Sequence, residues 1–99
     1  MNPDALVEIR FRTPEEGGRK EPFLGGEYHC PLFVDGEAFD CRLYFGALKV
    51  TLGERYEVPI KFIAGTSALS KLTEGKKIVL WEGKEIADGK VVKLYATNL

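Results

Sequence analysis

The sequence lacks the features of a membrane-spanning or disulfide-rich protein. None of its apolar runs approaches the roughly 20 residues that are needed to cross a bilayer. The 99 residues include only 2 cysteines and 1 histidine, too few for a structural zinc site with four ligands in paired spacing. Met1–Ala5 has neither the basic start nor the apolar stretch of a signal peptide. We therefore expect a cytoplasmic chain that binds no metal and enters no membrane.

The sequence also lacks an excess of charge of one sign. It has 14 lysines and arginines against 15 acidic residues, a formal net charge of −1. A general nucleic-acid binder usually carries a strong positive excess, so any RNA contact would need a local basic patch. The chain contains no GxxxxGK[ST] phosphate loop, and no carboxylates are paired in clearly different surroundings. GTP hydrolysis and acid–base catalysis therefore have no support in the sequence.

What the sequence does contain is a regular series of short apolar segments separated by 11 glycines and 5 prolines. No helical period survives between these residues, and alternation with period two predicts strands. A length of 99 residues with 44% hydrophobic residues fits one domain, residues 1–99. The segments predict an all-β, six-stranded antiparallel barrel with strands at Leu6–Arg12, Tyr28–Val34, Glu37–Phe45, Arg55–Ile63, Lys77–Glu82 and Glu85–Tyr95.

Two connections are long. Residues 13–27 read as a loop because of their glycines. In residues 64–76, Ser67–Leu72 could form one short helical turn, or the whole connection could be a loop. Asp88-Gly89, inside the last strand, predicts a bulge or bend. Trp81 either fills the core or lies at an interface, and its position in the sequence leaves both alternatives open.

A hairpin register follows from Asp35-Gly36, the strongest short turn signal in the chain. A two-residue turn places four pairs on an apolar, inward face: Val34 with Glu37, Leu32 with Phe39, Cys30 with Cys41, and Tyr28 with Leu43. The outer face then pairs Phe33 with Ala38, Pro31 with Asp40, and His29 with Arg42. Pro31 and Pro59 point to an edge or a bulge in their strands, where they would oppose edge pairing. We therefore expect a monomer or a weak dimer.

Cys30 and Cys41 admit two interpretations. They could form a redox-active cross-strand disulfide, or they could be reduced core thiols that pack as small hydrophobic residues. The register makes them a hydrogen-bonded pair, whose side chains are farther apart than a disulfide prefers. We therefore favour reduced thiols. His29 has a cation, Arg42, opposite it and Cys30 on the other face, so no Cys/His or Ser/His/Asp catalytic arrangement forms and we predict no catalytic residues.

A resemblance begins at the loop after the first strand. Glu16–Phe23 resembles the EGGR-x-x-PF stretch of the third domain of elongation factor Tu, and Gly25–Pro31 follows with the glycine, tyrosine and strand proline of that family. Trp81–Val92 is similar to its C-terminal hairpin, with Gly-Lys-Glu in place of Gly-Gly-Arg, whereas residues 64–76 match poorly. The resemblance implies a Greek-key closed barrel of the translation-factor C-terminal type, without a GTPase domain.

In that family the barrel contacts the acceptor arm of aminoacyl-tRNA and partner proteins, so the resemblance implies a non-enzymatic binding module without a cofactor. We predict a protein partner, with structured RNA as the alternative. A second hypothesis is an immunity or inhibitor protein for one partner such as a toxin, and a third is a small enzyme. The candidate partner-binding residues are Arg10, Arg12, Arg19, Lys20, His29 and Arg42. Arg10, Arg12, Arg42 and His29 would form one basic patch if the first strand adjoined the second or third.

Overall fold

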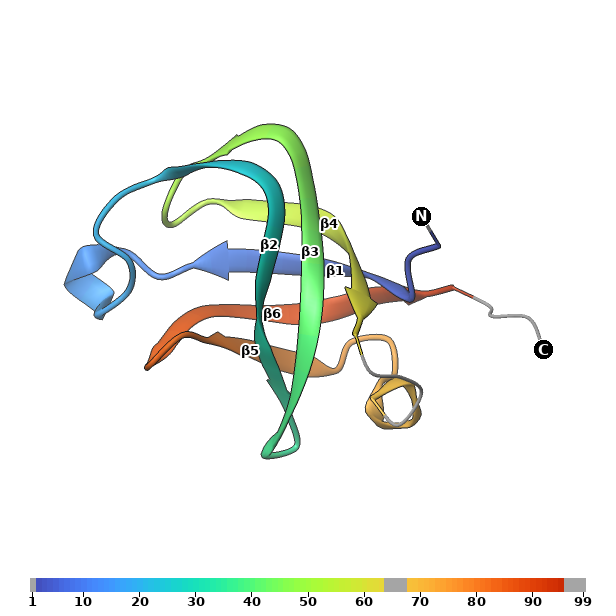
Figure 1. The fold of residues 1–99 in the computed structure, drawn as a ribbon. Helices are drawn as coiled ribbons and strands as arrows, with labels where there is room; N and C mark the ends of the chain where they lie inside the picture. Colours follow the sequence, from blue (N-terminus) through green and yellow to red (C-terminus); the bar gives the residue numbers. More distant parts are fainter. Residues whose placement is uncertain (1, 64–67, 96–99) are drawn as a thin grey trace.

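The computed structural model describes residues 2–63 and 68–95. Within them the chain forms a closed antiparallel barrel with the strand order β1-β4-β3-β2-β5-β6 (Figure 1). The strands are β1 Ala5–Phe11, β2 Phe23–Val34, β3 Glu37–Val50, β4 Arg55–Phe62, β5 Lys77–Trp81 and β6 Glu85–Leu94. β2, β3 and β4 are successive neighbours and β1 lies beside β4, which is a Greek-key arrangement. The predicted six-stranded closed barrel is confirmed.

The predicted hairpin register is confirmed throughout. Cys30 lies opposite Cys41 and His29 opposite Arg42. The turn has positive φ at both central residues, 52° at Asp35 and 79° at Gly36, as a type I′ turn requires. Because this turn fixes the register, Leu32 and its inward neighbours are buried on one face while His29 and its neighbours stay on the other.

The hairpin is longer than the sequence predicted. Residues 13–27 do not form one loop, because β2 already begins at Phe23, and β3 continues beyond Phe45 to Val50. Phe23 pairs with Val50, and the register shifts around Gly26. A Cβ at Gly25 would overlap Phe45. The glycines that suggested a loop therefore allow two strands to approach closely and bend.

Pro31 and Pro59 each lie directly before the residues at which their strand pairs with its second neighbouring strand. β2 pairs with β5 only at Leu32 and Phe33, directly after Pro31. β4 pairs with β3 only from Ile60 to Phe62, directly after Pro59. Neither proline interrupts a described ladder, so both occupy local edges inside a closed barrel.

The predicted bulge at Asp88-Gly89 is wrong. Both residues pair regularly with β1 on one side and with β5 on the other, and the irregularity in the β1–β6 ladder lies between Leu6 and Val7. Gly89 is needed for another reason. A Cβ at this position would overlap the carbonyl oxygen of Glu8, so glycine lets β6 approach the backbone of β1.

Buried side chains from all six described strands fill the barrel. At one end Phe11, Phe23, Tyr28 and Phe45 form an aromatic cluster with ring centroids 5.0–6.0 Å apart. The other end is covered by Ala68 and Leu72, which are both buried. They flank η2, a single 3₁₀ turn at Leu69–Lys71, so of the two alternatives for Ser67–Leu72 the short helical turn is present. Ser67 itself lies outside the described residues. A second 3₁₀ turn, η1, spans Pro14–Glu16 at the opposite side of the barrel (Figure 1).

Gly89→Ala should destabilise the fold by about 2–3 kcal/mol, because the new methyl group must displace the β1 backbone. Urea unfolding of the purified chain measures this difference. Gly83→Asn is a matched control, since nothing lies within 4 Å of a Cβ there and asparagine tolerates positive φ. An unfolding free energy for Gly89→Ala equal to that of Gly83→Asn would contradict the proposed close approach.

Candidate functional site

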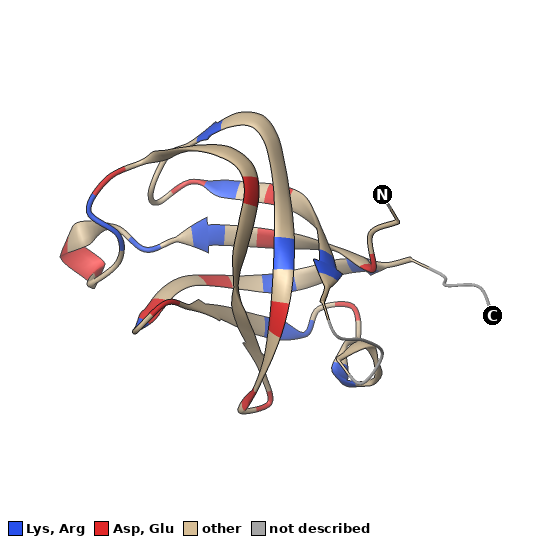
Figure 2. Ribbon diagram, in the orientation of Figure 1, with Lys and Arg blue, Asp and Glu red and all other residues tan. Residues whose placement is uncertain are grey.

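The candidate basic residues do not gather on one surface. β1 lies between β4 and β6 rather than beside β2 or β3, so Arg10 and Arg12 are separated from His29 and Arg42. Lysines and arginines are interspersed with acidic residues over the visible strands (Figure 2). The condition for a joint patch of Arg10, Arg12, Arg42 and His29, that the first strand adjoin the second or third, is therefore not met.

Arg10 and Arg12 both hold carboxylates from other segments. The guanidinium of Arg10 donates to both Glu16 carboxylate oxygens, at 3.1 and 3.2 Å. Arg12 donates to both oxygens of Asp88, at 2.9 and 2.8 Å, and lies 3.0 Å from a Glu85 oxygen. The hydrogen bond from Arg12 lowers the pKa of Asp88. Both arginines therefore link separate segments of the chain through ion pairs.

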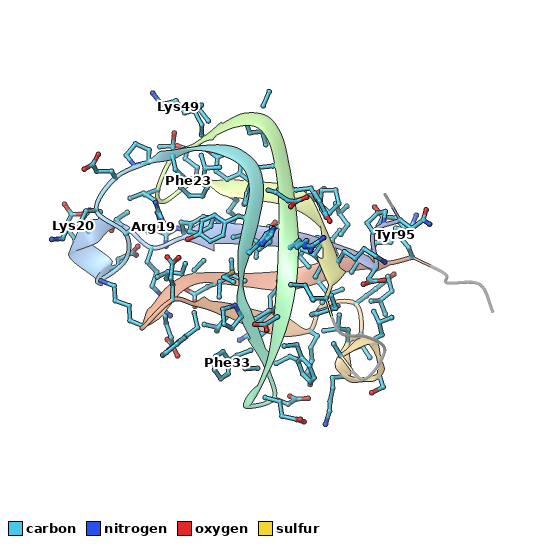
Figure 3. The ribbon with its side chains drawn as sticks, in the orientation of Figure 1. Arg19, Lys20, Phe23, Phe33, Lys49 and Tyr95 are labelled. Carbon is cyan, nitrogen blue, oxygen red and sulfur yellow. The ribbon has the colours of Figure 1, made fainter. Side chains whose placement is uncertain are left out.

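Arg19 fastens the glycine-rich loop to the barrel. Its guanidinium carbon lies 4.6 Å from the centre of the Phe23 ring and 5.6 Å from that of Tyr28, and Figure 3 shows Arg19 beside Phe23. Arg19 donates to the Tyr28 hydroxyl at 2.9 Å, and that hydroxyl donates to Glu82 at 2.9 Å. Burial raises the pKa of Tyr28. The loop packs against the barrel through Arg19, whose Nη1 is hydrogen-bonded while its buried Nε has no hydrogen-bond partner among the described residues.

The remaining candidates are dispersed. His29 Nε2 lies 2.8 Å from a Glu27 carboxylate oxygen. Arg42 has His29 opposite it on β2 and Lys61 opposite it on β4. Lys20 lies in the loop at the far side from Phe33 (Figure 3). Among residues 2–63 and 68–95, neither Lys20 nor Arg42 is in an ion pair.

The cysteine pair is buried and reduced. Cys30 and Cys41 are free thiols, and Cys41 Sγ donates to the Cys30 carbonyl oxygen at 3.5 Å. Interaction with the Cys30 side chain, together with burial, raises the pKa of the Cys41 thiol. A thiol that stays protonated is a poor nucleophile, so these residues pack in the core. In the described part of the chain, no cluster of three His, Cys, Asp or Glu residues could hold a metal ion.

The sequence interpretation missed a group of large apolar side chains on the outer surface. Phe33 on β2 pairs with Val79 on β5, and the Phe33 ring centroid lies 6.2 Å from that of Trp81 at 61°. Trp81 is 39% exposed, which excludes its placement in the core. Figure 3 shows Phe33 on the outside of the barrel. These side chains form an apolar surface where β2 meets β5.

This surface is concave. It contains a hollow of about 370 Å³, which we call the aromatic hollow, lined by Phe33, Asp35, Gly36, Lys77, Val79, Trp81 and Glu85. Its charged rim around an aromatic floor is the usual composition of a protein-binding site. A sequence signal existed, because Phe33 falls on the outer face of the hairpin, but the meeting of β2 with β5 could not be read from the chain.

The comparisons with known proteins add no family. No family model matches the chain, and no curated protein is significantly similar to it. No helix in the described ranges is long and apolar enough to cross a membrane. The candidate site therefore rests on its geometry alone.

Asp88→Asn should lower the free energy of unfolding by about 0.5–1 kcal/mol at neutral pH, a modest value because Asp88 is half exposed. Arg12 lowers the folded pKa of Asp88 below its ordinary 3.8. The carboxylate therefore stabilises the fold above that ordinary pKa, and this contribution disappears as the pH falls through the lowered folded value. Thermal melting at neutral pH and at the lowest pH that keeps the chain folded measures both limits.

Asp40→Asn is the control for that comparison, because Asp40 makes no ion pair among the described residues. Its melting temperature should differ little from that of the wild type at neutral pH. An Asp88→Asn deficit that is the same at both pH values would show that the carboxylate charge does not stabilise the fold.

Proposed function

We propose that this chain is a non-enzymatic binding module and that its partner is a protein that docks on the aromatic hollow. The observation that carries the proposal is the contact between Phe33 and Trp81 on the outside of a closed barrel. Trp81 is exposed and Phe33 is half-buried beside it, and aromatic side chains in such concave sites contribute much of the energy at protein interfaces. Scattered single apolar residues such as Leu24, which is 77% exposed, need no such explanation.

The distribution of charge favours a protein over RNA. RNA contact requires a contiguous basic stripe that follows the phosphate backbone. Three of the six candidate basic residues, Arg10, Arg12 and Arg19, are paired with carboxylates, and a fourth, His29, lies against Glu27. The two remaining candidates, Lys20 and Arg42, do not form a contiguous basic stripe.

The proposal extends to the kind of barrel. A closed six-stranded antiparallel barrel agrees with the fold expected from the resemblance to the third domain of elongation factor Tu. We propose that the chain is a translation-factor-type barrel. Because one fold hosts many functions, the resemblance supports a binding role and leaves the partner to be found through the hollow.

Pull-down from native lysate should recover one stoichiometric protein that nuclease treatment does not release. Phe33→Ser should reduce this recovery at least about tenfold, because the loss of a central aromatic contact typically costs more than a tenfold change in affinity. Leu24→Ser is the matched control, since it removes an exposed apolar side chain elsewhere and should retain the partner. Urea unfolding verifies that both variants are folded.

Three results would contradict the proposal. Recovery of material that nuclease abolishes would indicate an RNA partner. Equal loss of the partner with Phe33→Ser and Leu24→Ser would remove the aromatic hollow from the interface. Equal retention of the partner by both variants would also show that the aromatic hollow is not part of the interface.

A further inference from the structure

Two lysines next to the aromatic hollow face each other across neighbouring strands. Lys77 on β5 is directly opposite Lys90 on β6, and both are exposed. Like charges in this position repel one another and destabilise a sheet. Lys77 also lines the aromatic hollow itself. The arrangement is therefore a local concentration of positive charge beside an apolar surface.

The carboxylates nearest to these lysines are engaged elsewhere. Glu8 is opposite Lys90 on β1, but its oxygen lies 3.5 Å from Arg55. Asp88, two positions before Lys90 on β6, lies 2.8 Å from Arg12 in an ion pair. No ion pair in the described ranges includes Lys77 or Lys90. The positive charge at this place is therefore left uncompensated within those ranges.

The acidic residues on the rim of the hollow are also in ion pairs. Asp35 lies 2.8 Å from Lys76, and Glu85 lies 3.0 Å from Arg12. A molecule that enters the hollow therefore meets an apolar floor and Lys77, which is unpaired within the described ranges, whereas both rim carboxylates are already in ion pairs.

A second, shallower hollow of about 600 Å³ continues from the first over β6 and β1. Lys77 and Val79 line both hollows, and Lys90 lines the second. The apolar floor and the lysine pair thus belong to one continuous surface. A segment that covers Phe33 and Val79 can extend directly over Lys77 and Lys90.

We infer that the partner docks through an acidic segment that combines an apolar anchor for the aromatic hollow with a carboxylate for Lys77 and Lys90. This inference rests on the proposed function and specifies its partner. Val79 and Lys77 are alternate residues of one strand, about 6.6 Å apart along it. An extended partner segment matches this distance with a spacing of two residues, and a helical one approaches it with three or four. The carboxylate should therefore lie two to four positions from the anchor.

A displayed library of short random peptides, selected on the folded wild-type chain and counter-selected on Phe33→Ser, tests this inference. The enriched peptides should carry an aspartate or glutamate two to four positions from an aromatic or aliphatic residue. A synthetic peptide of the enriched sequence should bind about tenfold more weakly to the double variant Lys77→Glu, Lys90→Glu, because electrostatic complementarity becomes repulsion. Replacement of its acidic residues by lysine should restore binding to that variant.

The matched control is Lys20→Glu, Lys49→Glu, which changes the net charge equally at sites remote from Phe33 (Figure 3). It should bind the synthetic peptide as the wild type does. Weakening by the control pair to the same degree would reduce the effect to overall charge and overturn the inference. Equal binding of an oligoglutamate peptide without an apolar residue would also overturn it, since the site would then be merely cationic.

The remaining outcomes separate the two proposals. Enrichment of peptides that need Phe33 but show no acidic preference would overturn the acidic segment and leave the protein-binding function standing. Enrichment of no peptide that depends on Phe33 would overturn the aromatic hollow as a docking site, and the acidic segment with it.

Discussion

The barrel closes through a ladder of only two residue pairs between β2 and β5. Leu32 pairs with Leu80, and Phe33 pairs with Val79. Both leucines are fully buried, and burial of each contributes about 2 kcal/mol to stability. The next pair faces outward, so the same seam that completes the core places Phe33 and Val79 side by side on the surface. Closure of the barrel and formation of the aromatic hollow are consequences of one contact.

The remaining surface is organised by ion pairs between segments that are distant in sequence. Arg12 and Asp88 are 76 positions apart, and Arg10 and Arg19 hold the connection between β1 and β2 through Glu16 and Glu82. These interactions pair three of the six candidate basic residues, Arg10, Arg12 and Arg19, with carboxylates. They leave uncovered an apolar surface with a lysine pair at its margin, and the proposed docking site rests on this surface.

The elements that could be predicted from the sequence are those governed by local rules. Asp35-Gly36 determines a turn type, and the turn determines the register from Val34–Glu37 to Tyr28–Leu43. Strand alternation likewise identified β1, β5 and β6 to within one residue at each end. These features depend on neighbouring residues, so one chain is sufficient to reveal them.

The features that could not be predicted depend on which strands become neighbours. Gly89 was read as a bulge because its contact with the backbone of Glu8 exists only once β1 and β6 adjoin. Whether Arg10 and Arg42 share one patch depends on the order of strands around the barrel, which the sequence does not give. Trp81 stayed ambiguous for the same reason, since its neighbour Phe33 lies on a strand 48 positions earlier in the sequence.

The most direct test of the docking surface is amide hydrogen exchange of the chain alone and in complex with its captured protein partner. If the partner docks on the aromatic hollow, protection should increase at residues 33–36 and 77–81 and stay unchanged in the loop at Arg19 and Lys20. Protection confined to the outer face around Arg42 and Lys61, with residues 33–36 and 77–81 unchanged, would contradict docking on the hollow.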